Sequence, residues 1–155
     1  MTVTTSAPLD LPEIREVDEI ARADLVFYGV DHSGPSYQAL VFINNRGASA
    51  DTERTLDQGF AGTFSVFGHN GCYGDKGHCL PGARFTDVFD VRGPHPLRPL
   101  TVTVIATAAV RHALLDPDVR EIVVTTVAVV PEDEFPKASS SPLAYEYVRL
   151  WTYED

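Results

Sequence analysis

The chain has 155 residues, of which 44% are hydrophobic and 22% are charged, and this is the composition of a globular domain rather than a disordered segment. Acidic residues outnumber basic ones by 22 to 12, so the formal net charge is −10. A field of that sign repels phosphate groups, which excludes nucleic acid and anionic membrane surfaces as partners and suits a cationic partner or a metal ion.

The first segment, residues 1–22, is rich in acidic residues and contains Pro8 and Pro12. We expect it to form an acidic N-terminal tail with little regular structure. It has no basic region followed by an apolar stretch, so no signal peptide is visible, and the expected compartment is the cytoplasm.

From Ala23 onwards the pattern becomes typical of strands, with short apolar or alternating runs separated by turn residues. Leu100–Val110 alternates threonine with valine and isoleucine, and Glu121–Val130 is the most β-branched part of the chain. We therefore predict one all-β domain over residues 23–155, an antiparallel β-sandwich of about seven strands, jelly-roll or cupredoxin-like, with long loops and almost no helix. The other predicted strands are 25–28, 37–43, 60–67 and 145–153, and residues 85–91 fit either a strand or a short helix.

The segment Gly68–Gly82 interrupts this pattern, because five of its fifteen residues are glycine. Such a composition is incompatible with the interior of a strand or a helix. Loops of this length usually have a function, so we take this segment as the candidate functional site.

Thiol and imidazole side chains cluster in this loop, at His69, Cys72, His78 and Cys79. These groups are the ligands that soft and borderline metals prefer, and two thiolates with one histidine fit Cu(I). A disulfide between Cys72 and Cys79 explains the same residues, and a structural zinc site explains them less well. Tyr73, between the cysteines, either projects into a partner or packs against the sandwich.

Nucleophilic catalysis has little support in the sequence. The residues Asp31, His32 and Ser33 are of the types found in a catalytic triad, but adjacent residues cannot form one, and the following Gly34-Pro35 favours a turn. No Gly-x-Ser-x-Gly motif is present. We therefore assign no catalytic residue and lean away from an enzyme.

Four stretches together resemble the C-terminal β-sandwich domain of tyrosinases, polyphenol oxidases and molluscan hemocyanins: Asp31–Tyr37, Val41–Asn45, Phe60–Phe64, and Phe67–Cys79 with its glycine-cysteine loop. In that family the domain covers the entrance to a type-3 dicopper centre, and one of its side chains occupies the substrate pocket. The resemblance implies that Tyr73 is this partner-binding side chain, with Phe67 as the second candidate. It also implies that Cys72 and Cys79 handle copper.

The family's dicopper centre needs six histidines on a helical bundle, whereas this chain has five histidines in β segments. We therefore expect a non-catalytic auxiliary subunit that shields, or delivers copper to, a separately encoded tyrosinase-like type-3 copper oxidase. The alternative is a stand-alone metal- or thiol-dependent enzyme that acts on a small phenolic or peptide substrate through Gly68–Gly82. A third hypothesis is an assembly module that pairs with a partner or with itself as a homo-oligomer.

Overall fold

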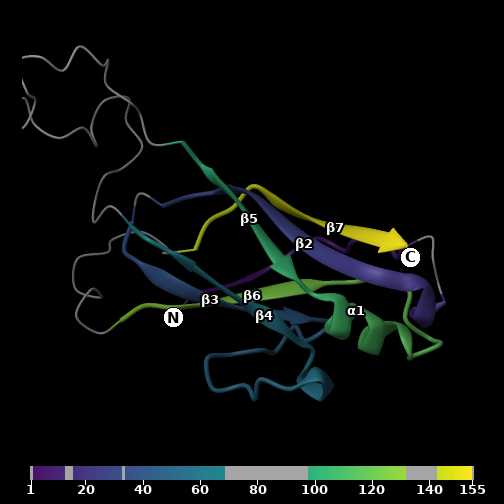
Figure 1. Cartoon of the computed structure of the whole chain (residues 1–155). Coiled ribbons are helices and arrows are strands. Elements are labelled where there is room, and N and C mark those ends of the chain that lie inside the picture. Colours follow the sequence, from purple (N-terminus) through teal and green to yellow (C-terminus); the bar gives the residue numbers. More distant parts are fainter. Residues whose placement is uncertain (1, 13–15, 33, 69–97, 132–142, 155) are drawn as a thin grey trace, which may run out of the picture.

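The fold is described from a computed structural model, which covers residues 2–12, 16–32, 34–68, 98–131 and 143–154. Two antiparallel sheets face each other in these residues, and Figure 1 shows them as two layers. One sheet has the strand order β1-β6-β3-β4 and the other has the order β5-β2-β7, so the predicted antiparallel β-sandwich is confirmed. The strands are β1 (Thr2–Thr5), β2 (Ile20–Val30), β3 (Tyr37–Ile43), β4 (Phe60–Val66), β5 (Leu100–Ile105), β6 (Val124–Val129) and β7 (Tyr147–Glu154).

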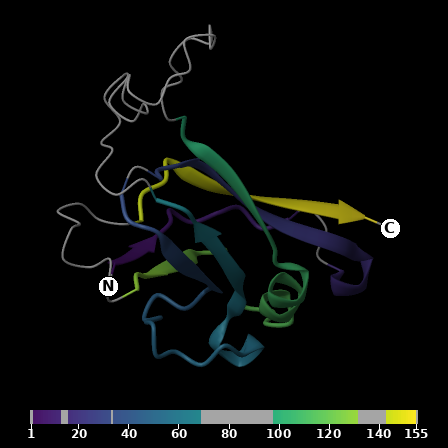
Figure 2. The same cartoon turned by 60° about the vertical axis from the view of Figure 1, so that its left-hand side comes forward.

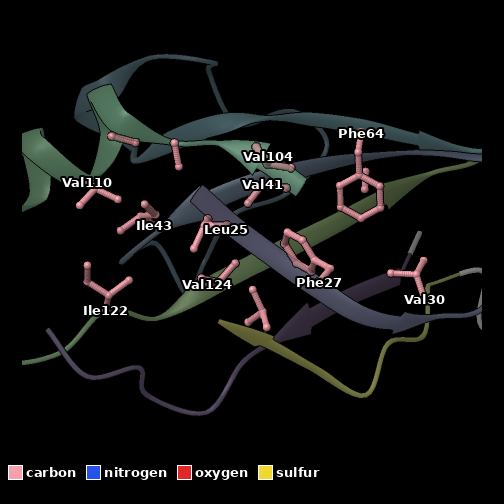
Figure 3. Close-up of a cluster of buried hydrophobic side chains, with 14 of the residues drawn as sticks. Leu25, Phe27, Val30, Val41, Ile43, Phe64, Val104, Val110, Ile122 and Val124 are labelled. Atoms are coloured by element: carbon pink, nitrogen blue, oxygen red, sulfur yellow. The ribbon is translucent and has the colours of Figure 1, made fainter. Parts of the chain in front are cut away.

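The core lies between the two sheets and is built from inward-facing residues of every strand except β1 (Figure 3). Leu25 and Phe27 of β2 are fully buried, and so is Val41 of β3. The Phe27 ring packs against the Phe64 ring of β4, with the ring centroids 5.1 Å apart. Because this cluster draws on both sheets, burial of its apolar surface holds the two layers together.

From Ala39 to Ile43, strand β3 is buried on both faces, which explains why this part of its sequence is entirely apolar. Its inward face contributes to the main core, and its outward residues Leu40 and Phe42 form a second cluster with Val127. The loop between β3 and β4 covers this cluster with Ala48, and the Phe42 and Phe60 rings meet edge to face at 5.5 Å. The part of the outer face around Leu40 and Phe42 is therefore covered by the loop between β3 and β4.

The N-terminal segment differs from the expected tail. Thr2–Thr5 forms β1 and pairs antiparallel with β6, and Leu9 continues the contact through an isolated bridge to Ile122. The acidic residues follow this strand, while the strand itself is threonine- and valine-rich, a composition that suits pairing. A short 3₁₀ helix at Val17–Glu19 then leads into β2, which begins at Ile20.

The predicted strand over Leu100–Val110 is wrong in its second half. The strand ends at Ile105, and Thr107–Leu114 forms the helix α1. The residues after Ile105 are alanine-rich and lack the threonine–valine alternation, which favours a helix. Buried Val110 anchors α1 against the core, and the Arg111 guanidinium donates hydrogen bonds to the carbonyl of Ile20.

The remaining predicted strands lie where the sequence placed them, with ends that shift by a few residues. The region predicted as 85–91 lies outside the described residues. A second 3₁₀ helix, Leu56–Gln58, lies in the loop before β4, and α1 packs beside it at one end of the sandwich (Figure 2).

Candidate functional site

The turn between β2 and β3 holds both ends of the segment 69–97. The carbonyl oxygen of Arg98 accepts a hydrogen bond from Nε2 of His32 at 2.8 Å. A carbonyl can only accept, so Nε2 must carry the proton. At the other end, the backbone N–H of Gly68 donates to Oγ of Ser36 at 3.1 Å. The segment that carries the candidate metal ligands therefore leaves and re-enters the described fold at one turn.

Gly68 fits so closely against this turn that only glycine is accommodated. A Cβ atom on Gly68 would overlap the carbonyl oxygen of Gly34 and the backbone of Pro35. The absence of a side chain lets the two backbones touch, which is a common reason for glycine at a close approach. The direction in which the chain leaves β4 is fixed by this contact.

The turn also contacts the segment before β7, since the backbone N–H of Asp31 donates to the carbonyl of Ala144 at 2.9 Å. The sequence predicted this turn, and the structure confirms it, but its role as an anchor was missed. The sequence contained part of the signal for such an anchor, because His32 precedes and Ser36 follows the Gly34-Pro35 pair just before a predicted strand. Nothing in the sequence indicated which distant backbone groups they would bind.

Phe67, the second candidate for a partner-binding side chain, lies at the end of β4 immediately before this anchor. Its exposed fraction is 85%, more than that of any other large apolar side chain in the described residues. It borders a hollow of about 420 Å³ whose other lining residues include Tyr37, Val66 and Val129. An exposed aromatic ring beside an apolar hollow is typical of a protein contact site.

Tyr37 is buried below this hollow, at the start of β3, with 3% of its surface exposed. Its hydroxyl group has no hydrogen-bond partner among the described residues. Burial raises the pKa of Tyr37 above its usual range, and the nearby Asp31 carboxylate raises it further. The side chain therefore stays neutral near pH 7 and contributes mainly packing to this end of the sandwich.

The remaining candidate residues, His69, Cys72, Tyr73, His78 and Cys79, lie outside the described residues, so their mutual geometry stays a prediction. Within the part of the chain that the structure describes, no group of three or more histidine, cysteine, aspartate or glutamate side chains is placed to hold a metal ion. The metal hypothesis therefore depends on the chemistry of the loop residues alone.

A second hollow, which the sequence did not predict, lies at the opposite end of β3. It has a volume of about 430 Å³ and lies between α1 and the loop that precedes β4. His112 of α1 approaches Asp57 across it, with 3.5 Å between Nε2 and Oδ1. The Asp57 side chain is largely exposed to solvent and the His112 side chain is partly buried. The hollow is at the opposite end of β3 from the turn that binds Gly68 and Arg98.

These features define an antiparallel β-sandwich in which one turn binds Gly68 and Arg98, the described residues on either side of the glycine- and cysteine-rich sequence. The sequence matches no protein-family model and no curated protein. Solved structures of polyphenol oxidases do match the fold. A recombinant latent aurone synthase, a polyphenol oxidase crystallised with hexatungstotellurate(VI), superimposes with a TM-score of 0.54 at 12% identity. The latent enzyme from its natural source gives a TM-score of 0.52 at 13% identity.

Both matches cover 99% of this chain but only 24% of the oxidase chain, so this chain spans about a quarter of the length of the proteins it resembles. The predicted resemblance to a polyphenol oxidase sandwich domain is therefore confirmed for the fold. No helix in the described ranges is long and apolar enough to cross a membrane.

Proposed function

We propose that this chain is a non-catalytic auxiliary subunit that shields, or delivers copper to, a separately encoded tyrosinase-like type-3 copper oxidase. The observation that carries the proposal is the match of 99% of this chain to a quarter of a polyphenol oxidase. A chain whose fold corresponds to a quarter of such an oxidase is expected to act together with the remaining oxidase architecture. Both loop ends are anchored at one turn, which supports the presentation of a defined surface to that partner.

The shielding role rests on Phe67, which is exposed at the end of β4 beside the apolar hollow. Tyr73 follows it six positions later in the sequence and is the other candidate side chain. Inserting an aromatic ring into a partner's pocket removes apolar surface from water and contributes about 1.5–3 kcal/mol for each ring. The rigid turn beneath Phe67 limits the conformational entropy that such an insertion costs.

The delivery role rests on the donor set. Cys72 and Cys79 offer thiolates, and His69 or His78 offers an imidazole, which suits Cu(I) rather than a hard cation. Such ligands hold copper in its reduced state and release it by ligand exchange with another site. The protein's net charge of −10 favours the approach of a cation.

Copper binding is tested by competition with a chromogenic Cu(I) chelator under anaerobic, reducing conditions. We expect the native chain to take one Cu(I) per chain, and Cys72→Ser and Cys79→Ser to bind it at least about tenfold more weakly. His112→Ala, at the other end of β3, is the matched control and should bind as the native chain does. Equal binding by all four proteins would contradict the delivery role.

The auxiliary role itself is tested with a metal-free tyrosinase-like oxidase. Copper-loaded native chain should form a complex with that enzyme and raise its diphenol oxidase activity above that obtained with free Cu(I) chelate. Absence of both a complex and activation would overturn the proposal. Turnover of a phenol by the chain alone, lost in Cys72→Ser, would instead support a stand-alone enzyme.

A further inference from the structure

Strand β7 is an open edge of the three-stranded sheet. Within the described residues it pairs with β2 alone, in a continuous register from Arg22–Tyr153 to Tyr28–Tyr147 (Figure 1). The strand has eight residues and contains no proline and no lysine, the residues with which proteins often block an edge. The strand β1, at one edge of the four-stranded sheet, has only four residues and is therefore half as long as β7.

The other two edge strands, β4 and β5, lie close together on the far side of the sandwich. A Cβ atom on Gly62 of β4 would come within 2.8 Å of Cγ1 of Val104 in β5. The strand orders then place β1 and β7 on the same side. The sheet that contains β1 has one strand more than the sheet that contains β7. The position next to β7 and across from β1 is therefore occupied by no strand of the described residues.

Two hollows mark this position. One, of about 220 Å³, is lined by residues 4–7 and 9 on one side and 145–148 on the other. The second, of about 310 Å³, continues along Pro8–Asp10 and Arg149–Trp151. The two hollows lie between β7 and the N-terminal residues 4–10, so no described residue fills the space beside most of the strand.

The outer face of β7 carries a row of aromatic side chains. Tyr147, Trp151 and Tyr153 are 43%, 46% and 50% exposed. The Tyr147 ring stacks on Tyr28 of β2 at 4.8 Å, and the Arg149 guanidinium lies 5.2 Å from the centre of the same ring. In the described part of the chain no loop covers this face, whereas the loop before β4 covers the outer face of the other sheet.

We propose that β7 pairs antiparallel with β7 of a second copy of this chain, about a two-fold axis at Leu150. The two three-stranded sheets then join into one sheet of six strands. Antiparallel pairing about Leu150 places Arg149 opposite Trp151 of the second copy and Tyr147 opposite Tyr153. Cation–π and aromatic cross-strand pairs of this kind stabilise antiparallel strands. On the inner face, Leu150 meets its own copy and Val148 meets Thr152.

The register follows from the alternation of side chains. A shift of the pairing by one residue would place the aromatic face of one strand against the inner face of the other. An axis at Arg149 would oppose two guanidinium groups directly. An axis at Trp151 would place Val148, which is buried, opposite Glu154. The axis at Leu150 is the register in which each outer aromatic or cationic side chain meets a favourable partner.

The pairing has an electrostatic cost. Each copy has a formal net charge of −10, and Glu146 meets Glu154 of the second copy in this register. A single pair of eight-residue strands also buries less than the roughly 1,200 Å² of a stable interface. We therefore expect a monomer–dimer equilibrium that shifts toward the dimer as salt screens the repulsion.

Sedimentation of the native chain over a concentration series, at low and at moderate salt, tests the proposal. Trp151→Lys places a lysine opposite Arg149 of the second copy and should raise the dimer dissociation constant by about tenfold or more. The double variant Arg149→Glu with Trp151→Lys creates two opposite-charge pairs and should restore the dimer. Ile105→Lys, 61% exposed on β5, is the matched control and should leave the equilibrium unchanged.

Disulfide trapping tests the register, in a chain whose Cys72 and Cys79 are replaced by serine. Tyr147→Cys and Tyr153→Cys should cross-link only when mixed, since each position faces the other, at a distance that suits a disulfide. A native chain that is monomeric at every concentration would overturn the proposal, as would a dimer insensitive to Trp151→Lys. A monomer that adds an unrelated extended peptide to β7 would also overturn it.

Discussion

Nε2 of His32 donates a hydrogen bond to the carbonyl oxygen of Arg98, across 66 positions in the sequence. The same turn binds the backbone N–H of Gly68 through Ser36. The residues on either side of the segment 69–97 are thus held by side chains of one six-residue turn, in addition to the strand pairs Tyr37–Val66 and Val30–Leu100 two residues away. We infer that this turn, together with the ends of β4 and β5, sets where the segment that carries the candidate ligands begins and ends.

Replacement of His32 by alanine tests the function of this anchor. We expect His32→Ala to lower the free energy of unfolding by about 1 kcal/mol, the usual loss for one side-chain hydrogen bond, measured by urea denaturation. It should also weaken Cu(I) binding and association with the oxidase. Asn45→Ala is the matched control, because it loses a hydrogen bond from Nδ2 to the Gln58 carbonyl at the opposite end of β3. Equal effects of both variants on Cu(I) binding would contradict the anchoring role.

Gly68→Ala probes the close approach beneath the same turn. The added methyl group meets the backbone of Gly34 and Pro35, which cannot move aside as a flexible side chain would. We expect a loss of about 1–3 kcal/mol in the free energy of unfolding, typical of overpacking. Gly47→Ala is the control, because the nearest atom to its Cβ is Asn45 Oδ1 at 3.8 Å. A Gly68→Ala variant as stable as Gly47→Ala would show that the turn adapts.

The sequence was sufficient for the strands whose side chains face a single environment. Tyr37–Ile43 was predicted to the residue, because its apolar run lies between two clear turns. The helix α1 was missed because the strand pattern of β5 runs directly into it without a proline or glycine. The N-terminal strand was missed because its pairing with β6 joins residues at least 120 positions apart, and the short segment is polar and threonine-rich. Local sequence patterns do not indicate which distant strand a segment will pair with.

The residue types of the candidate site were predictable from the sequence, but the hydrogen bonds that hold its flanking residues were not. Cysteine and histidine in a glycine-rich loop indicated where to look, and the resemblance named Phe67, which is indeed highly exposed. The anchors could not be predicted, since His32 and Ser36 bind backbone groups whose position depends on the whole fold. The open edge of β7 likewise becomes visible only when the strand order is known.

Substitution of Phe67 should affect partner binding without affecting the stability of the fold. Since 85% of its surface is exposed, Phe67→Ala should leave the free energy of unfolding within about 0.5 kcal/mol of the native value. If its ring enters the oxidase, the same change should weaken the complex by about tenfold or more, measured by calorimetry. Leu115→Ala, which removes another exposed apolar side chain from the region after α1, serves as the control. Unchanged affinity in Phe67→Ala would leave Tyr73 as the candidate for insertion.

Two buried tyrosines predict an alkaline limit to stability. Burial raises the pKa of both Tyr37 and Tyr145 above the ordinary tyrosine value, and the neighbouring Thr126 hydroxyl partly offsets the rise for Tyr145. Above pH ~10 the unfolded chain releases the phenolic protons while the folded chain retains them. Stability is therefore fully present below this pH and falls as the pH rises, by about 1.4 kcal/mol per pH unit for each tyrosine.

Tyr37→Phe should remove one of these contributions. Above pH ~10, the free energy of unfolding of this variant should fall less steeply with pH than that of the native chain, by about 1.4 kcal/mol per pH unit. Near pH 7 the variant should be as stable as the native chain or slightly more so, because the Tyr37 hydroxyl is buried without a partner among the described residues. Tyr37→Phe combined with Tyr145→Phe should remove both contributions. Urea denaturation at a series of pH values measures the slopes, and a slope unchanged by both substitutions would mean that other groups cause the alkaline loss.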